Sequence, residues 1–481
     1  MNFAIVRYLI GWMLGIESIF LLLPALTAVI YGEAELPAYL TAAAISLAGA
    51  ALLCHRKPKN TRFYAREGYV TVALCWLVLA VIGALPFVLS REIPFFIDAL
   101  FETVSGFTTT GATILGDVEA LSHASMLWRC LTHWVGGMGV LVFMLIVLPL
   151  AGGQTIFLMR AESPGPAVSK MSPHMRDTAT ILYAIYFGLT VLQMILLLIG
   201  GMPLFDAICV SLGTAGTGGF GNWNDSIAHY NSAYLQNVIT VFMILFGINF
   251  SAYFLILTRK FRQAFRIEEI RVYLGVIFVF AGLIAFNVRP MFGSLRESFH
   301  HALFQVASII TTTGFSTVDF DRWPTFSRAL LVLLMFIGAC AGSTGGGIKC
   351  SRILLLGKSV KKEMMCLIHP RLVRVNKMDG QRVPHEVMRS INVFVVAYAF
   401  IFILSLLIIS LNCEDLVTCF TSVATTLNNV GPGLSLCGPT CNFDFFPPLS
   451  KCVLIFDMLA GRLELFPMLL LFTPDTRQRN K

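Results

Sequence analysis

Four short polar strips, each built around a glycine, interrupt a chain that is otherwise strongly apolar. The strips are TTTGA at 108–112, GTGGF at 216–220, TTTGF at 311–315 and NNVGP at 428–432. Alignment on the fourth residue of each strip superimposes Gly111, Gly219, Gly314 and Gly431, which are 108, 95 and 117 residues apart. Each interval has room for two apolar helices and a linker, so the pattern indicates four related units in one chain.

The segments around the strips predict a membrane protein. Hydrophobic residues make up 56% of the chain and charged residues only 13%, whereas about a quarter of the residues are charged in a soluble domain. Apolar runs of about 20 residues recur from end to end, and each is long enough to cross ~30 Å of hydrocarbon. The first run, 1–30, is too long for a cleavable signal and is expected to be the first span. We therefore expect an all-α polytopic membrane protein and exclude an ordinary soluble enzyme.

The segment before each strip is too short to cross as a helix. From Phe95 to Thr108 a helix would extend only ~20 Å at 1.5 Å per residue, so the segment must be re-entrant. The first and third units agree here, with FETVSGFTTTG matching FQVASIITTTG. Non-helical backbone at membrane depth is tolerated where it is buried in protein or lines a water-filled cavity. Four such strips predict four segments that meet around one aqueous path.

The chemistry of such strips suits a desolvated cation. Backbone carbonyl oxygens on an extended strip replace the hydration shell of the ion, and glycine permits the backbone geometry. A short helix that ends at each strip also directs its partly negative C-terminal end there. The alternative is that Thr and Gly merely allow close helix packing in lipid, but four strips in register favour a pore.

At this point the sequence resembles the bacterial Trk/Ktr/HKT superfamily, and within it the TrkH-type potassium-translocating subunits. The resemblance rests on SGFTTTGAT, GTGGFGNWN, ITTTGFSTVDF, NNVGPG, GSTGGGIK at 342–349 and GRLELFP at 461–467. It implies twelve spans arranged as four pseudo-symmetric units of span, pore helix, filter and span around one pore, after two extra N-terminal spans. The implied divisions are 1–66 for the extra spans, then pore units at 67–177, 178–270, 271–389 and 390–481.

The resemblance also implies which residues act. The expected K⁺-binding filter residues are Thr109, Thr110, Gly111, Thr217, Gly218, Gly219, Thr312, Thr313, Gly314, Asn429, Val430 and Gly431. The second strip diverges most from the others, which leaves its ligand positions the least defined. The expected gate residues are Gly342, Ser343, Thr344, Gly345, Gly346, Gly347, Lys349 and Arg462.

The basic residues test the topology independently. With the strips placed outside, 26 of the 35 Lys and Arg residues fall in the expected cytoplasmic segments and six in outer ones, as the positive-inside rule requires. Both termini are then cytoplasmic, and the net charge of +8 belongs to loops rather than to a nucleic-acid surface. Arg129, Lys349 and Arg462 remain inside or beside predicted spans, where a cation usually marks function or a buried pair.

Arg462 and a glycine-rich stretch can each be interpreted in two ways. Arg462 either obstructs cations below the filter or forms a structural ion pair with another unit, since Asp457 and Glu464 are poorly placed on its own helix. The stretch from Gly338 to Cys350 contains five glycines, which weaken a helix by about 1 kcal/mol each. It is either an intramembrane gating loop, as the resemblance implies, or a kink for tight packing. A phosphate loop is excluded because Ile348 stands where a Walker motif requires Lys.

The remaining polar residues support simpler roles. Asp98 and Asp206 are expected to begin and cap pore helices, and an ion-attracting vestibule is the alternative. The acids that follow the first three strips either form turns or concentrate cations; they are Asp117, Asp225 and Asp319. The basic linker 352–389 is either a solvated loop or a docking surface. Cys437 and Cys441 could form a disulfide if their loop faces an oxidising compartment.

The leading function is K⁺ uptake, with Rb⁺ also accepted, through a gated pore in the bacterial cytoplasmic membrane. The alternative is a Na⁺- or H⁺-linked secondary cation transporter, which would usually show two-fold repeats with broken helices. An intramembrane enzyme lacks a spaced nucleophile and base or a metal cluster. The resemblance implies a homodimer that pairs with a cytoplasmic TrkA-type nucleotide-binding ring. Besides membrane lipid we expect no nucleic-acid partner and no cofactor in this chain, with K⁺ as the transported ion.

Overall fold

The computed structural model describes residues 1–58, 65–139, 175–370 and 375–473. Within these ranges six helices are long and apolar enough to cross a membrane. They are α1 (Phe3–Tyr31), α2 (Leu36–Cys54), α3 (Ala65–Ser90), α8 (Met175–Ile199), α13 (Glu268–Val288) and α17 (His385–Ile409). A seventh span is formed if α10 (Ala233–Phe246) and α11 (Phe250–Leu257), which meet at 93°, count as one. Of the segments expected to be cytoplasmic, 475–481 and all but the last three residues of 154–177 lie outside the described residues.

The long helices present apolar side chains outward. On α17, residues spaced three or four apart lie on one exposed face: Val396, Phe400, Ile403 and Leu407, each more than half exposed. An apolar stripe of this spacing faces lipid in a membrane helix, because side chains three and four residues apart share one side of the helix. The chain is therefore an all-helical, multi-span membrane protein. In the described residues the strands are limited to the antiparallel pair β1 (Lys377–Met378) and β2 (Gln381–Arg382).

Four shorter helices end where the polar strips begin, as the sequence predicts. They are α4 (Phe96–Phe107), α9 (Leu204–Gly216), α14 (Leu295–Ile310) and α18 (Leu416–Asn428). Their 12 to 16 residues correspond to roughly 18–24 Å of helix, less than the ~30 Å needed to cross. Each of these helices is therefore too short to cross a membrane by itself.

A further helix follows each strip and packs back on the short helix before it. These are α5 (His123–Gly137), α10, α15 (Thr325–Ile337) and α19 (Pro448–Arg462). The same helices also contact the next short helix along the chain: α5 packs on α9, α10 on α14, α15 on α18, and α19 on α4. The last contact joins residues more than 340 positions apart, so the four sets of helices close on themselves.

Two helices are interrupted on one side of the strips. This is the side on which the C-terminal ends of α5 and α19 lie. α15 ends at Ile337 and α16 (Cys350–Ile368) begins only after the glycine-rich stretch, so the expected helix break is present. α19 ends at Arg462 and α20 (Phe466–Phe472) follows after a turn in which Glu464 and Leu465 have positive φ. The remaining elements are α12 (Phe261–Arg266) and the 3₁₀ turns η1 (Ser226–His229), η2 (Arg289–Met291), η3 (Phe320–Arg322) and η4 (Ser435–Cys437).

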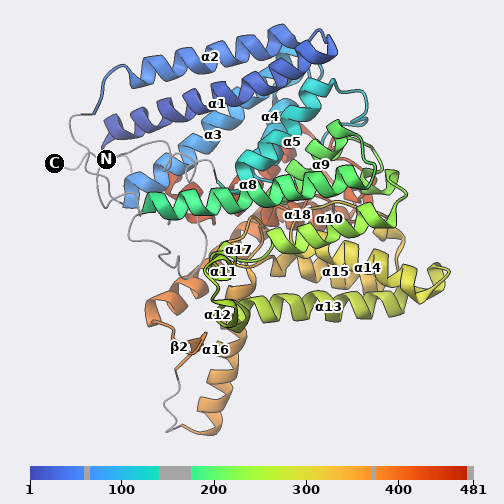
Figure 1. Ribbon diagram of the computed structural model, residues 1–481. Coiled ribbons are helices and arrows are strands. Elements are labelled where there is room, and N and C mark those ends of the chain that lie inside the picture. The colour runs from blue at the N-terminus through green and yellow to red at the C-terminus, as the bar shows by residue number, and fades with distance from the viewer. Residues whose placement is uncertain (59–64, 140–174, 371–374, 474–481) are drawn as a thin grey trace.

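The N-terminal pair of helices lies at one edge of the molecule. α1 packs along α2 and contacts both α3 and α5, and Figure 1 shows these helices side by side at the top of the view. At the opposite edge α16 and the β1–β2 hairpin project away from the other helices (Figure 1).

The expected capping role of two acidic residues is wrong. Asp98 and Asp206 lie in the first turns of α4 and α9, but neither side chain caps its helix. Asp98 instead accepts a hydrogen bond of 2.6 Å from Lys451 Nζ, and Asp206 accepts one of 2.7 Å from Asn222 Nδ2. Both carboxylates are thus used in tertiary contacts, which the local sequence pattern does not encode.

Candidate functional site

The four strips share one backbone conformation. In every strip the aligned glycine and the residue two positions before it have positive φ, the left-handed region that glycine tolerates best. The pairs are Thr109 (56°) and Gly111 (79°), Thr217 (54°) and Gly219 (78°), Thr312 (59°) and Gly314 (86°), and Asn429 (57°) and Gly431 (97°). A left-handed residue at every second position turns successive carbonyl groups toward one side, whereas they alternate in a regular strand.

The strips touch one another in chain order through these glycines. A Cβ on Gly111 would overlap the carbonyl oxygen of Gly218, and a Cβ on Gly219 would overlap that of Thr313. A Cβ on Gly314 would lie 2.5 Å from the carbonyl oxygen of Val430, and one on Gly431 would lie 2.7 Å from that of Thr110. Every carbonyl in this set belongs to the residue just before the glycine of the next strip. The four strips therefore form a closed ring of backbone contacts with no room for side chains.

The side chains of the strips are held within the protein. The hydroxyls of Thr108 and Thr110 lie 2.8 Å apart, and those of Thr311 and Thr313 lie 2.7 Å apart. Asn429 Nδ2 donates to Thr110 Oγ1 at 2.9 Å, which ties the fourth strip to the first. With these hydroxyls engaged, the backbone carbonyl oxygens of the ring remain available to a ligand.

One side of the ring opens into a cavity of about 130 Å³. All four aligned glycines line it, together with residues of the loops that follow the strips. Of the acids that follow the first three strips, Asp117 and Asp319 each accept a hydrogen bond from a backbone N–H two residues on and so form turns, while Asp225 lies 3.7 Å from His229 Nδ1. Cys437 and Cys441, also in this lining, are both free thiols.

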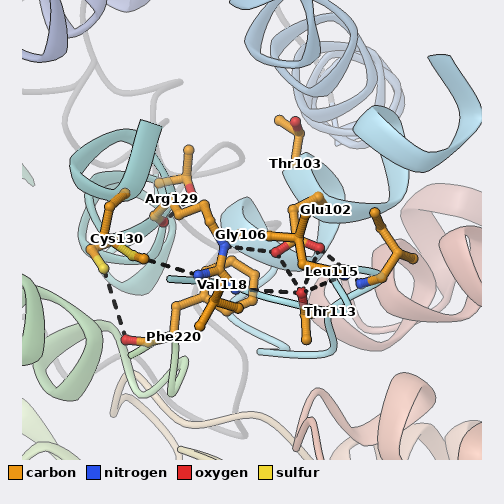
Figure 2. Close-up of polar contacts among 12 residues, drawn as sticks. Glu102, Thr103, Gly106, Thr113, Leu115, Val118, Arg129, Cys130 and Phe220 are labelled. Atoms are coloured by element: carbon orange, nitrogen blue, oxygen red, sulfur yellow. Dashed lines mark hydrogen bonds and ion pairs between the residues drawn. The ribbon is translucent and has the colours of Figure 1, made fainter. Parts of the chain in front are cut away.

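A buried ion pair joins the first two strips. Glu102 of α4 accepts a hydrogen bond of 2.7 Å from Arg129 Nε of α5, and the same carboxylate accepts from Thr113 Oγ1 and Ile114 N at 3.0 Å. The Arg129 guanidinium lies over the Phe220 ring at 3.9 Å. Figure 2 shows these groups meeting between the two strips. Arg129 is thus a structural cation, and Glu102 is its partner, which sequence reasoning missed.

His133 of α5 makes a second link between the first two units. Its Nδ1 lies 2.7 Å from the carbonyl oxygen of Gly106, while the Phe220 N–H donates to Nε2 at 3.2 Å. This pattern assigns the neutral tautomer that carries its proton on Nδ1. The imidazole therefore fixes the second strip against the short helix of the first unit.

The glycine-rich break lies directly beneath the third and fourth strips. The Gly346 N–H donates to Thr312 Oγ1 at 2.6 Å, and the Gly347 N–H donates to the carbonyl oxygen of Asn428 at 3.0 Å. Gly345 also packs on the third strip, where a Cβ would lie 2.9 Å from the carbonyl oxygen of Thr311. The loop thus closes on the ring from the side opposite the cavity.

Other residues expected to belong to the gate lie farther from the strips. The Gly342 carbonyl accepts from Phe250 N at the bend between α10 and α11, and Ser343 Oγ donates to Cys340 within the loop. Lys349 is buried and its Nζ donates to the carbonyl oxygen of Gly345. The structure therefore brings 345–347 to the ring, links Thr344 to Phe246 and Arg462, and gives Gly342, Ser343 and Lys349 contacts that hold the loop.

Glu269 of α13 clamps the two ends of this loop, a role that the sequence did not suggest. Its Oε1 accepts hydrogen bonds from Ala341 N at 2.7 Å and from Ser351 N at 3.0 Å. At the C-terminal end Arg352 forms a bidentate pair with Glu464, in the turn after α19. The loop is therefore attached both to α13 and to the turn after α19.

Arg462 reaches the underside of the ring and the loop together. Its guanidinium donates to Thr109 Oγ1 at 3.2 Å and to the carbonyl oxygen of Thr344 at 2.8 Å. It also donates to the carbonyl oxygens of Gly136 and Gly137, at 2.6 and 2.7 Å. The guanidinium keeps its positive charge under all ordinary conditions.

Comparisons with known proteins agree with this arrangement. Residues 38–480 match the family described as TrkH, cation transport protein. The chain is 38% identical to the Trk system potassium uptake protein TrkH of Salmonella typhimurium, over 98% of this chain and 99% of that protein, and 38% identical, with the same coverage, to the protein of that name in Escherichia coli strain K12. The crystal structure of the potassium transporter TrkH from Vibrio parahaemolyticus superimposes with a TM-score of 0.89 at 33% identity, over 99% of this chain and all of that one.

Proposed function

The chain belongs to the TrkH family of cation transport proteins, and from this premise we propose that it is the potassium-translocating subunit of a Trk-type uptake system. The observation that carries the proposal is the closed ring of four glycine strips. Carbonyl oxygens that converge on one axis supply the ligands that a dehydrated K⁺ requires. The negative ends of α4, α9, α14 and α18 all terminate at this ring, which favours a cation there and opposes an anion.

The proposed architecture is four pseudo-symmetric units around one pore, preceded by two extra spans in 1–66. The units occupy 67–177, 178–270, 271–389 and 390–481, and the closed chain of helix contacts between successive units supports this division. The aligned glycines and the two residues before each form the filter, at 109–111, 217–219, 312–314 and 429–431. The shared φ pattern supports their equivalence, including that of the divergent second strip.

The proposed gate is the loop 342–347 with Lys349 and Arg462. The loop occupies the space beneath the ring, and Arg462 adds a fixed positive charge at the same level. A K⁺ ion that leaves the filter on this side meets both, so movement of the loop would be needed for passage. The clamp by Glu269 gives the loop fixed ends and leaves its centre as the part that moves.

The subunit is proposed to lie in the cytoplasmic membrane of a bacterium with both termini inside, since most basic residues then fall on the cytoplasmic side. It is further proposed to form a homodimer and to bind a TrkA-type nucleotide-binding ring. α16 projects from the other helices in Figure 1, and together with the basic residues of 352–389 it would offer a surface for such a regulator.

Purified protein in liposomes tests the proposed function. We expect passive K⁺ and Rb⁺ uptake down a gradient without any cosubstrate. Uptake that requires an imposed Na⁺ or H⁺ gradient would instead favour an ion-coupled transporter. Repeating the measurement with the nucleotide-binding partner added tests the proposed regulation separately.

A further inference from the structure

A single acidic side chain is buried in the N-terminal helix pair without a partner. Glu17 lies near the middle of α1 and is 2% exposed. Among the described residues, neither of its carboxylate oxygens has a hydrogen-bond partner. Other buried glutamates of this chain are different, because Glu102 accepts from Arg129, and Glu269 accepts from two backbone N–H groups. Glu17 is therefore the exception that requires an explanation.

The surroundings of Glu17 are apolar. A small cavity of about 10 Å³ beside it is lined by α1, α3, α4 and α5, through Ile16, Phe20, Leu79, Phe107, Trp128 and Val135. The indole N–H of Trp128 is already donated to the carbonyl oxygen of Gly83, at 2.9 Å. No group in this lining can therefore donate to the carboxylate or neutralise it.

The charged groups on the helices around Glu17 are bound elsewhere. On α3, Glu67 accepts from Asn2 N. On α4 and α5, Glu102 pairs with Arg129, and His133 is held by Gly106 and Phe220. On α2, the Tyr39 hydroxyl lies 2.8 Å from Ser125 Oγ. Within the part of the chain that the structure describes, a negative charge on Glu17 would thus have no counter-charge, and an unpaired ion at membrane depth bears the full penalty of lost hydration.

We propose that Glu17 is an intramembrane proton-binding site that is occupied at neutral pH. A bound proton removes the charge without needing any other partner. A metal cation does not fit, because it requires several oxygen ligands, whereas one carboxylate is the only charged oxygen donor in a lining of apolar side chains. The cavity is also at the lower limit for a single water molecule, so a proton is the ligand that the site can hold.

The site is in contact with the first strip. Phe107, which lines the cavity, is the last residue of α4 and directly precedes Thr108. Its ring packs edge-on against Trp128, with ring centroids 6.1 Å apart. Loss of the proton would draw water toward Glu17 and disturb this packing. On the basis of the proposed function, alkaline pH should then reduce K⁺ flux through the filter.

Infrared spectroscopy of the full chain in lipid decides the protonation state without any measurement of transport. The spectrum of Glu17→Gln is subtracted from that of the wild type at neutral pH. We expect the difference to contain the C=O band of a protonated carboxylic acid, which shifts in D₂O. Glu17→Met should lose the same band, and this variant replaces Glu17→Gln in the measurement if Glu17→Gln does not fold. A lost carboxylate band in place of the acid band would overturn the proposal.

An exposed acid provides the control. Glu363, whose side chain is 68% exposed, should contribute an ionised carboxylate band that disappears in Glu363→Gln. A second experiment compares the pH dependence of K⁺ uptake into liposomes between the wild type and Glu17→Gln. The wild type should lose at least half of its flux on alkalinisation, and Glu17→Gln should not. Equal pH dependence in both proteins would overturn the link to the first strip. If the wild type moves no K⁺, the proposed function fails, while the infrared result still decides the proton site.

Discussion

The guanidinium of Arg462 donates a hydrogen bond of 3.2 Å to the hydroxyl of Thr109, which connects the end of α19 with the first strip from beneath. The same guanidinium holds the centre of the glycine-rich loop through the carbonyl oxygen of Thr344. One permanent charge thus contacts both the proposed filter and the proposed gate. Two unit charges 4 Å apart interact by about 4 kcal/mol at an effective dielectric constant of 20, and water in a pore would reduce this value.

Arg462→Ala should increase cation flux and leave the preference for K⁺ over Na⁺ nearly unchanged. If the charge adds only ~1.4 kcal/mol to the barrier, its removal speeds passage about tenfold. The selectivity should persist because the ring glycines are untouched. Flux into liposomes measures both quantities, and Arg462→Lys is the matched control that retains the charge.

Two outcomes would contradict this role of Arg462. One is wild-type flux in a folded Arg462→Ala protein. The other is misfolding that is rescued by a compensating change of a carboxylate in another unit, which would establish a structural ion pair.

Deletion within 343–347 should raise the basal flux, because it removes an obstruction without touching the ring. The loop contacts the strips from beneath, through Gly345, Gly346 and Gly347. Flux is measured without the nucleotide-binding partner, and thermal stability in detergent is recorded in parallel to separate gating from loss of fold. A folded deletion protein with normal flux and normal regulation would exclude the loop as the gate.

The pair of Glu102 and Arg129 should contribute strongly to stability. Removal of one member leaves a buried charge without its partner, which costs about 3–5 kcal/mol. Glu102→Gln and Arg129→Met are each expected to destabilise by that amount, and the double variant by less than their sum. Unfolding titrations in mixed micelles measure the three free energies. Additive effects of the two single changes would show that the pair is not coupled.

The N-cap of α18 should make stability depend on acidic pH. Hydrogen bonds from Thr418 and Ser435 lower the pKa of Asp415 from 3.8 to about 2. Because the pKa is lower in the folded protein, the ionised cap stabilises fully above the ordinary value and its contribution is lost as the pH falls toward 2. The stability difference between wild type and Asp415→Asn should therefore shrink between pH 4 and pH 2. A difference that is constant with pH would show that the charge of Asp415 contributes nothing.

Local repetition made the strips and their short helices predictable from the sequence. A glycine at a fixed place in four related strips indicates a backbone requirement, and the structure gives each one a positive φ. The helix break at Gly338 to Cys350 was also predictable, because several glycines in one segment weaken a helix.

Contacts between distant segments were not predictable. Glu102 and Arg129 are 27 positions apart, and nothing in their local sequences pairs them. Asp98 resembled a helix cap but is bound by Lys451, 353 positions away. Glu269 carries no motif, and its role as a clamp depends on where the loop folds. Glu17 is one acid in an apolar run, and only the packed structure identifies it as lacking a partner.

The most direct test of the shared filter is the bi-ionic reversal potential for K⁺ against Na⁺ in wild type and Gly111→Ser. A side chain at this position would press on the carbonyl oxygen of Gly218 in the next strip and so change the spacing of the ring. Gly275→Ser, on an exposed face of α13 with open space around it, is the control. We predict a K⁺-selective potential in wild type and control, and a shift toward Na⁺ in Gly111→Ser. Equal permeability to both ions in the wild type, or unchanged selectivity in a folded Gly111→Ser protein, would contradict the account.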